Sequence, residues 1–572
     1  MSRDFTSTVR FFLFLATLLS AQYAKGGDTL TVAKSFYHID YSKNIILVNK
    51  GVTAGTPQDL DPITHLQLDR TYTFLSSLNA AETDSAYQVA NQGRRFTLYF
   101  TQLPVIHLDA RNPIVDSPST YAKFTLAEPN GAVTELNAGV EIRGGFSQTY
   151  PKKSYELSLW NDTTGATTRD ARLLQMRTDN KWNLQALYNE PLRMRSKVAN
   201  ELWQEIHQLY YKASEPEAKI GIATAYVEVF VNNEYKGIYA LTERIDRKQL
   251  KLKKYDKGIK GELYKGSDWG GAVTFTELPP YDNSSETWGG FEYKHPEEEI
   301  NWSNLYSFVD FVKNTPNEEF YSRYKAWLKL DNAVDYYILL NLLRATDNTG
   351  KNLYIAKYKT GEPYFFVPWD LDGVFGTDWQ GLNSPTTDDL LTNGLYDRLR
   401  EDCSPNGFRA TLSQRWTQLR ATVLTEEKIR AKFATTHTYL RSNNVYAREQ
   451  LAWGEFTYGL DQLTYMNSWL RSRLTYLDAA FTQPCNNTTL ATTTGRLAPA
   501  LTLYPNPAND YVVVETTEPY ELCIRNVRGQ VLLRAQGRGR QEKIALGALP
   551  KGLHVATVTS STSVRTHKLL IN

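Results

Sequence analysis

The chain has 572 residues, of which 41% are hydrophobic and 12% are aromatic. This length is sufficient for three or four domains, and the apolar content can fill a large core, so a globular protein is expected. The 64 Lys and Arg residues almost balance the 62 Asp and Glu residues, which leaves a formal net charge of +2. No bulk field would therefore recruit nucleic acid or an anionic membrane.

Short sequence patterns exclude several classes of enzyme. The three cysteines, Cys403, Cys485 and Cys523, are far apart in the sequence. Their number and spacing exclude a disulfide framework and a CxxC metal site, and at most one bridge can form. The sequence contains no HExxH, GxSxG or GxxxxGK[ST] pattern. Zinc hydrolase, serine hydrolase and P-loop activities therefore have no support.

The N-terminus has the pattern of a secretory signal peptide. Arg3 and Arg10 precede an apolar run from Phe11 to Leu19, and small residues follow as far as Ala24. The run is nine residues long, which is shorter than the ~20 that cross a membrane. We expect a signal peptide over residues 1–24, no transmembrane segment, and a mature protein that is soluble outside the cytoplasm.

The next two regions are predicted to be rich in strands. Residues 25–100 alternate polar and apolar positions in short runs, which indicates a small β-rich domain without a chemical motif. Farther on, GVEIRG and SYELSLW are predicted strands on either side of the loop Gly144–Pro151, which is followed by Lys152 and Lys153. A glycine-containing loop lets backbone approach phosphate, and an adjacent lysine can neutralise charge. Lys153 is our candidate for that catalytic lysine, and Lys152 would lie nearby; the alternative is two solvated lysines.

An amphipathic helix is predicted within NEPLRMRSKVANELWQEIHQLY. Asn189 could cap it, Pro191 suits its first turn, and apolar residues recur at helical spacing. Arg195 falls on the apolar stripe, so it should face the interior and needs an anionic partner, either a phosphate or a core carboxylate. A kinase-like Lys–Glu pair would need a glutamate from this helix, and Glu205 is the better placed candidate.

A second predicted hairpin, YVEVFV and GIYALTE, turns at Asn232 and Asn233 and ends at Glu243 and Arg244. A strand that leaves one lobe for the next would form a hinge. The alternative for Glu243 is a surface salt bridge. Farther along the chain, LDNAVDYYILLNLLRAT is a predicted helix that delivers Asp347 at its end.

The segment from Asp347 to Gly376 carries the strongest chemical signal. Asp347 and Asn352 stand in a glycine-containing loop, LYIAKY and YFFVP are predicted strands joined by a turn, and Asp370 and Asp372 follow. The hairpin would bring both ends together. Protein kinases place an Asp and an Asn before a hairpin and a metal-holding Asp after it.

This arrangement suits phosphoryl transfer. Mg²⁺ across nucleotide phosphates needs hard oxygen ligands, for which Asn352 and Asp370 are suited with Asp372 in support. Asp347 would orient the attacking hydroxyl. A calcium-binding EF-hand is disfavoured because Phe375 occupies its glycine position. The remaining alternative is that these carboxylates only cap a turn.

The C-terminal third contains helices, a linker and a second strand-rich region. Helical patterns extend over residues 303–480, a Thr-rich linker is expected over residues 481–500, and a small β-sandwich over residues 501–572. LYPNPANDYVVV, NVRGQ, LPKGLHVATV and HKLLIN resemble the C-terminal sorting domain of type IX secretion, found in Bacteroidetes-like bacteria. That resemblance implies export across the outer membrane by the secretion machinery, then release or surface attachment. The alternative is an ordinary carbohydrate-binding or immunoglobulin-like module.

Four blocks of the central region, IRGGFSQTYPKKSYEL, LRMRSKVANELW, VEVFVNNEYKGIYALTERID and FFVPWDLDGVFG, resemble successive blocks of the spore-coat CotH kinase family. The match covers residues 103–400 and, more weakly, extends to 480. It implies ATP with Mg²⁺ or Mn²⁺ and phosphorylation of Ser/Thr on a protein or on the enzyme itself. It also places the pair Glu243 and Arg244 beside the nucleotide, whose phosphates our candidates Lys152, Lys153 and Arg195 would contact.

The expected fold class is α+β, with a divergent two-lobed protein-kinase-like domain over residues 101–480 flanked by small all-β domains. The expected function is that of a secreted, metal-dependent ATP phosphotransferase. Two alternatives stay open: a kinase-like surface or adhesion protein without catalysis, and transfer of an adenylyl or other group from the same nucleotide site.

Overall fold

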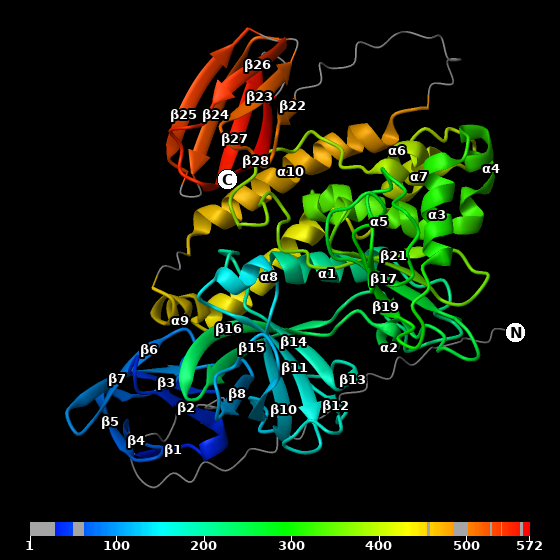
Figure 1. Cartoon of the computed structure of the whole chain (residues 1–572). Helices are drawn as coiled ribbons and strands as arrows, with labels where there is room; N and C mark the ends of the chain where they lie inside the picture. The colour runs from blue at the N-terminus through cyan, green and yellow to red at the C-terminus, as the bar shows by residue number, and fades with distance from the viewer. Residues whose placement is uncertain are drawn as a thin grey trace, which may run out of the picture. The chain divides into compact units, whose positions relative to one another are not determined.

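A computed structural model describes residues 29–49, 62–454, 458–485, 502–516, 518–526, 529–538, 540–560 and 564–572 (Figure 1). The chain divides into two compact units, residues 1–485 and 486–572. The predicted signal peptide and most of the predicted linker lie outside the described residues. Both helices and sheets are present, and the regions near both termini are built from strands, which confirms the α+β class with all-β flanks.

The first unit begins with a seven-stranded sheet. Its strands, in spatial order, are β1 (Thr29–Thr31), β4 (Ile63–Gln67), β5 (Thr71–Leu78), β6 (Ala86–Asn91), β7 (Arg94–Phe100), β3 (Ile45–Val48) and β2 (Tyr37–Asp40). A short 3-10 helix, η1 (Lys34–Phe36), precedes β2. Alternating residues such as Tyr72, Phe74, Phe96 and Leu98 form one hydrophobic cluster on this sheet.

A closed seven-stranded barrel follows. Around the barrel the strands run β10 (Val133–Arg143), β11 (Ser154–Trp160), β14 (Lys181–Gln185), β16 (Glu234–Thr242), β15 (Thr224–Val231), β8 (Val105–Ala110) and β9 (Thr120–Ala127). Apolar side chains of alternate positions fill its interior, as in the pair Val140 and Leu157 of β10 and β11. The two predicted hairpins, β10–β11 and β15–β16, are therefore confirmed as parts of one barrel.

Helix α1 (Arg195–Ile206) follows β14, six residues after the predicted cap. Asn189 does not cap it, because residues 187–193 form a turn in which Leu187 and Arg193 have positive φ angles. The Glu190 carboxylate instead accepts hydrogen bonds from the backbone N–H groups of Leu192 and Arg195, at 2.9 and 3.2 Å. A carboxylate at this end of a helix is favourable because the first N–H groups have no partner within the helix.

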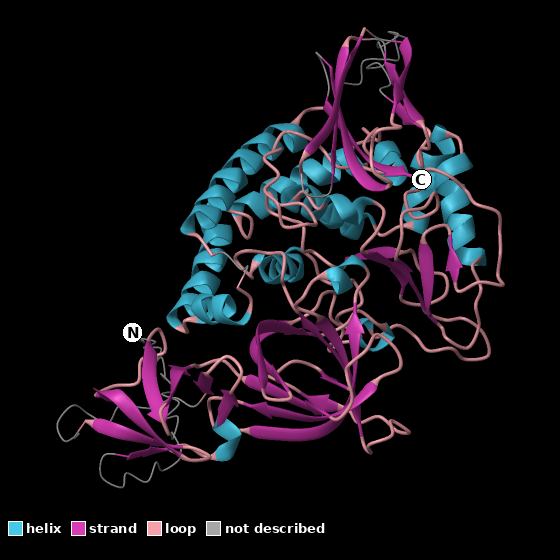
Figure 2. Cartoon of the chain, turned by 60° about the vertical axis from the view of Figure 1, so that its left-hand side comes forward, coloured by secondary structure: helices cyan, strands magenta, loops and turns pink. Residues whose placement is uncertain are grey.

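The rest of the first unit is a five-stranded sheet and a group of helices (Figure 2). The strand order is β18 (Thr287–Trp288), β19 (Phe291–His295), β17 (Glu262–Gly266), β20 (Leu353–Lys357) and β21 (Phe365–Pro368). The helices are α2 (Arg247–Leu250), α3 (Ser303–Asn314), α4 (Asn317–Trp327), α5 (Leu330–Leu343), α6 (Gly394–Leu399), α7 (Phe408–Ala421), α8 (Glu426–Ser442), α9 (Val445–Ala452) and α10 (Leu460–Thr482). The remaining short elements are η2 (Phe146–Thr149), η3 (Thr346–Thr349) and the pair β12 (Ala171–Arg172) and β13 (Thr178–Asp179).

One large hydrophobic cluster joins this sheet to α1 and the helices after it. Helix α5 lies at its centre and packs against β21, α7 and α10. A disulfide between Cys403 and Cys485 fixes the chain just beyond α10 to the segment before α7. It is the single bridge that the cysteine count allowed, and Cys523 is a buried free thiol.

The second unit is a β-sandwich. One sheet contains β22 (Thr502–Tyr504), β23 (Tyr511–Thr516) and β26 (Arg540–Ala545), and the other contains β25 (Val531–Gly537), β24 (Tyr520–Asn526), β27 (Gly552–Ser560) and β28 (Val564–Ile571). Residues from both sheets, among them Val514 and Ile524, share one hydrophobic cluster.

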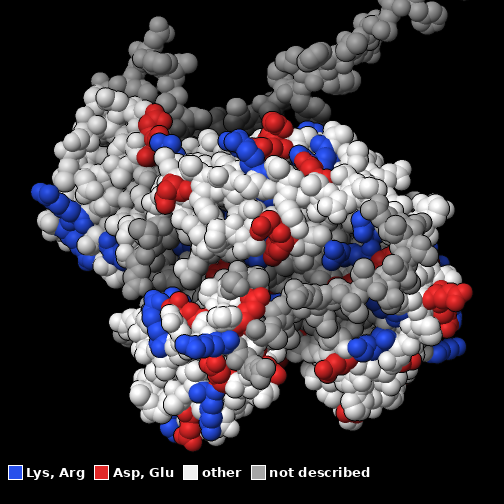
Figure 3. Space-filling view, turned by 90° about the horizontal axis from the view of Figure 1, so that it is seen from above, with Lys and Arg blue, Asp and Glu red and all other residues white. Residues whose placement is uncertain are grey.

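On the face shown in Figure 3, positive and negative side chains are interspersed. This mixture agrees with the nearly balanced charge of the sequence.

Candidate active site

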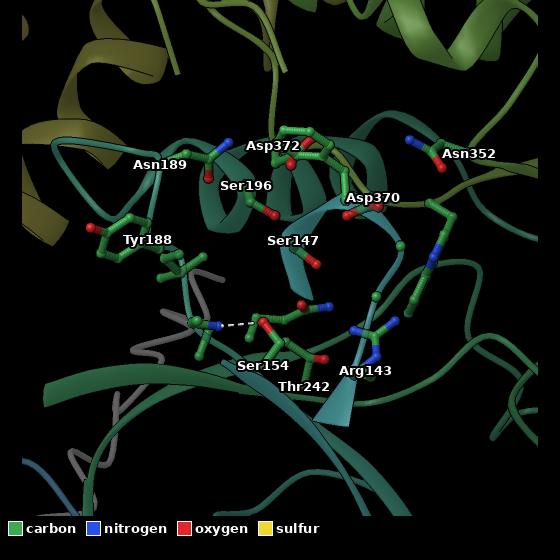
Figure 4. A pocket seen from close by; sticks show the side chains of 18 of the residues that line it. Arg143, Ser147, Ser154, Tyr188, Asn189, Ser196, Thr242, Asn352, Asp370 and Asp372 are labelled. Atoms are coloured by element: carbon green, nitrogen blue, oxygen red, sulfur yellow. Dashed lines mark hydrogen bonds between the residues drawn. The ribbon is translucent and has the colours of Figure 1, made fainter. Parts of the chain in front are cut away.

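A cavity of about 560 Å³ lies between the barrel and the sheet that contains β17, β20 and β21. Its volume is within the range of roughly 300–1,000 Å³ that ligand pockets occupy. The barrel contributes the β10–β11 loop and the ends of β14 and β16, and α1 contributes one side. The hairpin β20–β21 supplies the opposite end. Figure 4 looks into this cavity.

The predicted hairpin is confirmed, and it brings its two polar ends together. Leu353 pairs with Pro368, and the Trp369 N–H donates to the Asn352 carbonyl oxygen at 3.0 Å. Asn352 therefore precedes β20 at the place where Asp370 leaves β21. Both residues have φ 54°, a left-handed conformation that Asn and Asp tolerate better than most residues. Such conformations cluster at functional sites, where the surrounding structure holds them.

Asn348, a residue that the sequence did not single out, holds this junction. Its buried side-chain N–H groups donate to the carbonyl oxygens of Asn352 at 2.5 Å and of Trp369 at 2.8 Å. The Tyr336 hydroxyl from α5 donates to the Asn348 carbonyl oxygen at 2.9 Å. The packed helix is thus connected through one amide to both ends of the hairpin.

Negative charge gathers at this end of the cavity. Asp347, Asp370 and Asp372 all line it. Burial raises the pKa of Asp372 well above its ordinary value, and the nearby Asp370 and Asp347 raise it further. The Asp370 carboxylate makes no hydrogen bond with any residue that the structure describes. A cation would remove the repulsion among these groups.

The oxygen-bearing side chains at this end suit a hard divalent cation that is also held by the phosphate oxygens of a bound molecule. Within the described ranges, no three His, Cys, Asp or Glu side chains gather closely enough to hold a metal alone. Magnesium usually takes one or two carboxylates and completes its shell with phosphate oxygens and water. Asp370, Asp372 and the Asn352 amide oxygen match that requirement.

Arg143 faces this acidic end from the barrel (Figure 4). Its guanidinium lies 5.7 Å from the centre of the Trp369 ring, and among described residues it makes no hydrogen bond. Burial lowers the pKa of Arg143, and the nearby Asp370 opposes that shift. A partly buried guanidinium without hydrogen bonds suits an anionic ligand. Arg143 lies in the segment IRGGFSQTYPKKSYEL, but no sequence pattern predicted a role for it.

The glycine-containing loop leaves open space beside Arg143. A Cβ atom built on Gly145 would meet no protein atom within 4 Å, whereas one on Gly144 would collide with Ser147. Gly144 also has φ +108°, which a residue with a side chain rarely adopts. The loop therefore presents bare backbone to the cavity.

Lys152 lines the cavity, but its ammonium group is already bound. Its Nζ donates to both oxygens of Glu449 in α9, at 2.9 and 3.0 Å, and to the Ile238 carbonyl oxygen at 2.6 Å. The same carboxylate accepts a hydrogen bond at 2.9 Å from Arg193. Burial lowers the pKa of Lys152 to about 8, although Glu449 opposes the shift. All three N–H donors of Lys152 are used, so it forms part of the wall.

The other cations proposed for phosphate contact lie outside the cavity lining. Lys153 donates to the carbonyl oxygens of Gln148 and Tyr150, at 2.6 and 2.5 Å. Arg195 faces the interior as expected, but its partner is the Glu190 carboxylate at 2.5 Å. Of the two partners predicted for Arg195, a phosphate or a core carboxylate, the structure shows the carboxylate.

Two glutamates also differ in placement from the sequence expectation. Glu243 is buried and bound to Lys219 at 2.7 Å, and it does not line the cavity. Burial opposes ionisation of Glu243, but the hydrogen bond from Lys219 contributes to a lowered pKa. Glu205 is exposed and pairs with Lys432, and Lys152 pairs with Glu449 of α9 instead.

Aromatic rings line one side of the cavity mouth. Phe146 contacts Trp379 at 4.8 Å and Tyr150 at 5.7 Å between ring centres, and Tyr150 contacts Tyr188 at 5.3 Å. Phe146 is 53% exposed. These residues come from three separate loops, so no sequence pattern could predict that their rings form a row.

The part of the chain that forms this cavity matches a known protein family. Residues 140–477, more than half of the chain, match the family described as CotH kinase protein. The chain belongs to the CotH kinase family. The match includes the β10–β11 loop, α1, the hairpin and the helices that surround the cavity. A comparison with curated proteins found no match.

The second unit matches a different family. Residues 502–572 match the secretion system C-terminal sorting domain, as the sequence predicted. This domain directs export through type IX secretion to the cell surface or the extracellular space, and it implies contact with that machinery. Among the residues described, no helix is both long and apolar enough to span a membrane.

Proposed function

We propose that this protein is an exported, metal-dependent ATP phosphotransferase of the protein-kinase type. One observation carries the proposal: Asp370 and Arg143 face each other across a cavity, and neither side chain makes a hydrogen bond with a described residue. A metal-bound triphosphate supplies both missing partners, because its cation suits the carboxylate and its phosphates suit the guanidinium. Membership of the CotH kinase family supports the same activity.

The cation, Mg²⁺ or Mn²⁺, would be held by Asp370, Asp372 and Asn352, and it would neutralise charge on the phosphates. Arg143 would bind phosphate oxygens from the opposite side. The backbone at Gly145 could approach the phosphates closely, because no side chain intervenes there.

Asp347 would orient the acceptor hydroxyl and accept its proton. It lines the cavity beside Lys351 and Asn352, at the end of the helix-supported loop. Catalysis would then consist of positioning and charge neutralisation, without a covalent intermediate on the protein. The acceptor would be a Ser or Thr hydroxyl of a protein or of the enzyme itself.

The architecture also supports a two-lobed arrangement. The barrel would serve as the smaller lobe, and the sheet with the surrounding helices as the larger one, with the nucleotide between them. The aromatic row from Phe146 to Tyr188 offers flat surfaces for a base or an acceptor segment.

The test is incubation of the purified protein with ATP and Mg²⁺, followed by intact-mass and peptide analysis of the chain and of added proteins. A phosphoryl increment on Ser or Thr supports the proposal, and an adenylyl increment assigns the site to nucleotidyl transfer instead. No increment with any nucleotide favours a surface protein without catalysis. Asp347→Asn should abolish the increment, whereas Asp331→Asn, an exposed carboxylate on α5, should preserve it.

A further inference from the structure

A second cavity of about 260 Å³ lies among α5, α7, α10 and the residue after α6. It shares no lining residue with the first cavity. One wall is apolar and consists of Leu390, Leu412, Ala479, Ala480 and Phe481. The rest of the lining is polar and consists of Tyr337, Arg400, Arg409, Tyr476 and Gln483. Ligand sites typically combine an apolar wall with a few convergent polar groups of this kind.

Tyr337 supplies an unused hydrogen-bond donor. Its side chain is fully buried, and its hydroxyl has no hydrogen-bond partner in the part of the chain that the structure describes. The neighbouring Asn341 amide donates to the carbonyl oxygens of Tyr337 and Leu391, and its oxygen accepts from the Leu391 N–H. Buried hydroxyl groups are normally paired, so an orphan at a cavity wall points to a missing partner.

Positive charge surrounds this hydroxyl. The Arg400 side chain makes no hydrogen bond or ion pair with a described residue, and Arg409 donates only to the Gln483 carbonyl oxygen, at 3.1 Å. Behind the wall, the Arg473 guanidinium lies 5.7 Å from the centre of the Tyr476 ring. One nitrogen of that guanidinium also lacks a partner among the described atoms.

The nearby acidic groups do not neutralise the lining. Asp389 is bound to Arg344 and Arg473, at 2.8 and 3.1 Å. Asp397 accepts a hydrogen bond from Thr392 and does not line the cavity. The first turn of α7, where Arg409 lies, adds the partial positive charge of a helix N-terminus. The Gln483 carbonyl oxygen, just beyond α10, already accepts the hydrogen bond from Arg409.

We propose that this cavity binds a small organic anion, a carboxylate or phosphate group carried on an apolar body. Arg400 and Arg409 would pair with the oxyanion, the Tyr337 hydroxyl would donate to it, and the apolar wall would contact the body. The site is independent of the phosphotransfer proposal. The Cys403–Cys485 disulfide holds the end of α10 close to the start of α7, which keeps the cavity formed.

The test is calorimetric titration of the whole protein with four probes: benzoate, phenyl phosphate, inorganic phosphate and neutral benzyl alcohol. We expect benzoate or phenyl phosphate to bind with one site per chain, at least tenfold more tightly than benzyl alcohol and inorganic phosphate. If benzoate binds more tightly than phenyl phosphate, the site prefers a carboxylate; the reverse order indicates a phosphate. Equal binding of all four probes, or binding of none, would overturn the proposal.

Three variants locate the site. Tyr337→Phe and Arg400→Gln should each weaken the favoured probe about tenfold, whereas Arg323→Gln, an exposed arginine on α4, should leave it unchanged. Tyr337→Phe keeps the ring and removes only the orphan hydroxyl, so its melting temperature should equal or exceed that of the wild type. Wild-type affinity in both Tyr337→Phe and Arg400→Gln would place the probe elsewhere and refute the site.

Discussion

The two sides of the large cavity are built in opposite ways. At its acidic end, Asp347, Asn352, Asp370 and Asp372 come from one stretch of chain around a single hairpin, and like charges face one another. On the barrel side, Lys152 and Glu449 are separated by 297 residues and are fully paired. Buried side chains, among them Leu47 and Phe230, also pack the N-terminal sheet against the barrel. We propose that Asp370, which makes no hydrogen bond with a described residue, serves ligand binding, whereas the fully paired Lys152 and Glu449 hold the fold.

The largest expected effect on stability is at the buried ion pairs that Glu449 makes with Lys152 and Arg193. Glu449→Gln leaves Lys152 and Arg193 buried without their carboxylate, which should lower the free energy of unfolding by roughly 3–5 kcal/mol. Urea denaturation measures it. Glu205→Gln removes an exposed partner of Lys432 and should cost less than about 1 kcal/mol. Equal losses in the two variants would mean that Lys152 and Glu449 do not form a structural pair.

Asp370→Asn should behave in the opposite way. It removes a proposed cation ligand, so the rate of phosphoryl transfer should fall by about a hundredfold or more. It also removes a negative charge beside Asp372, so the melting temperature should stay the same or rise. Transfer assays and thermal unfolding on one preparation separate the two effects. A large loss of stability with normal transfer would reverse the roles of the two regions.

Asn348→Ala should affect stability and activity together. The change leaves the Trp369 carbonyl oxygen without its side-chain donor, whereas the Asn352 carbonyl oxygen keeps the Trp369 N–H; the loss should cost about 1–3 kcal/mol of stability. Because the ends of the hairpin are no longer tied, transfer should fall about tenfold. Asn304→Ala, which removes an exposed amide bound to Glu262, is the matched control. Normal transfer in Asn348→Ala would show that the hairpin keeps its geometry without this amide.

Acid should weaken the junction between the barrel and the N-terminal sheet. His38 in β2 stacks on Phe230 of the barrel, and burial, with His107 nearby, lowers the pKa of His38 to about 3. Between pH 6.5 and about 3 the unfolded chain therefore binds a proton that the folded chain does not. Stability should fall by about 1.4 kcal/mol for each pH unit below 6.5. Unfolding of wild type and His38→Gln at pH 7.5 and 5.5 checks this, and identical losses in the two proteins would contradict it.

The same contrast explains what the sequence could predict. The hairpin and its flanking Asp347, Asn352 and Asp370 follow from strand periodicity and short-range spacing, so their proximity could be foreseen. The partners of Lys152 and Arg195 could not. Glu449 is distant in sequence and lies on a short helix, and Glu190 occupies the turn where a simple helix cap was expected.

Arg143 and Asn348 illustrate a second limit. Arg143 ends β10 and Asn348 lies in the short 3-10 helix η3, and neither position has a periodic signal that predicts a role. Their importance depends on where the barrel and the second sheet meet, which is set by tertiary packing. The orphan hydroxyl of Tyr337 is invisible in the sequence for the same reason, since its ring fits the apolar pattern of α5.

The most direct test of the central claim is the thermal unfolding of the first unit with ATP, in Mg²⁺ and in EDTA. If the acidic end and Arg143 hold a metal–nucleotide complex, ATP with Mg²⁺ at a hundred times its Kd should add about 2.7 kcal/mol of stability. The increase should disappear in EDTA and in Asp370→Asn. An equal increase under all three conditions, or none in the wild type with Mg²⁺, would contradict the account.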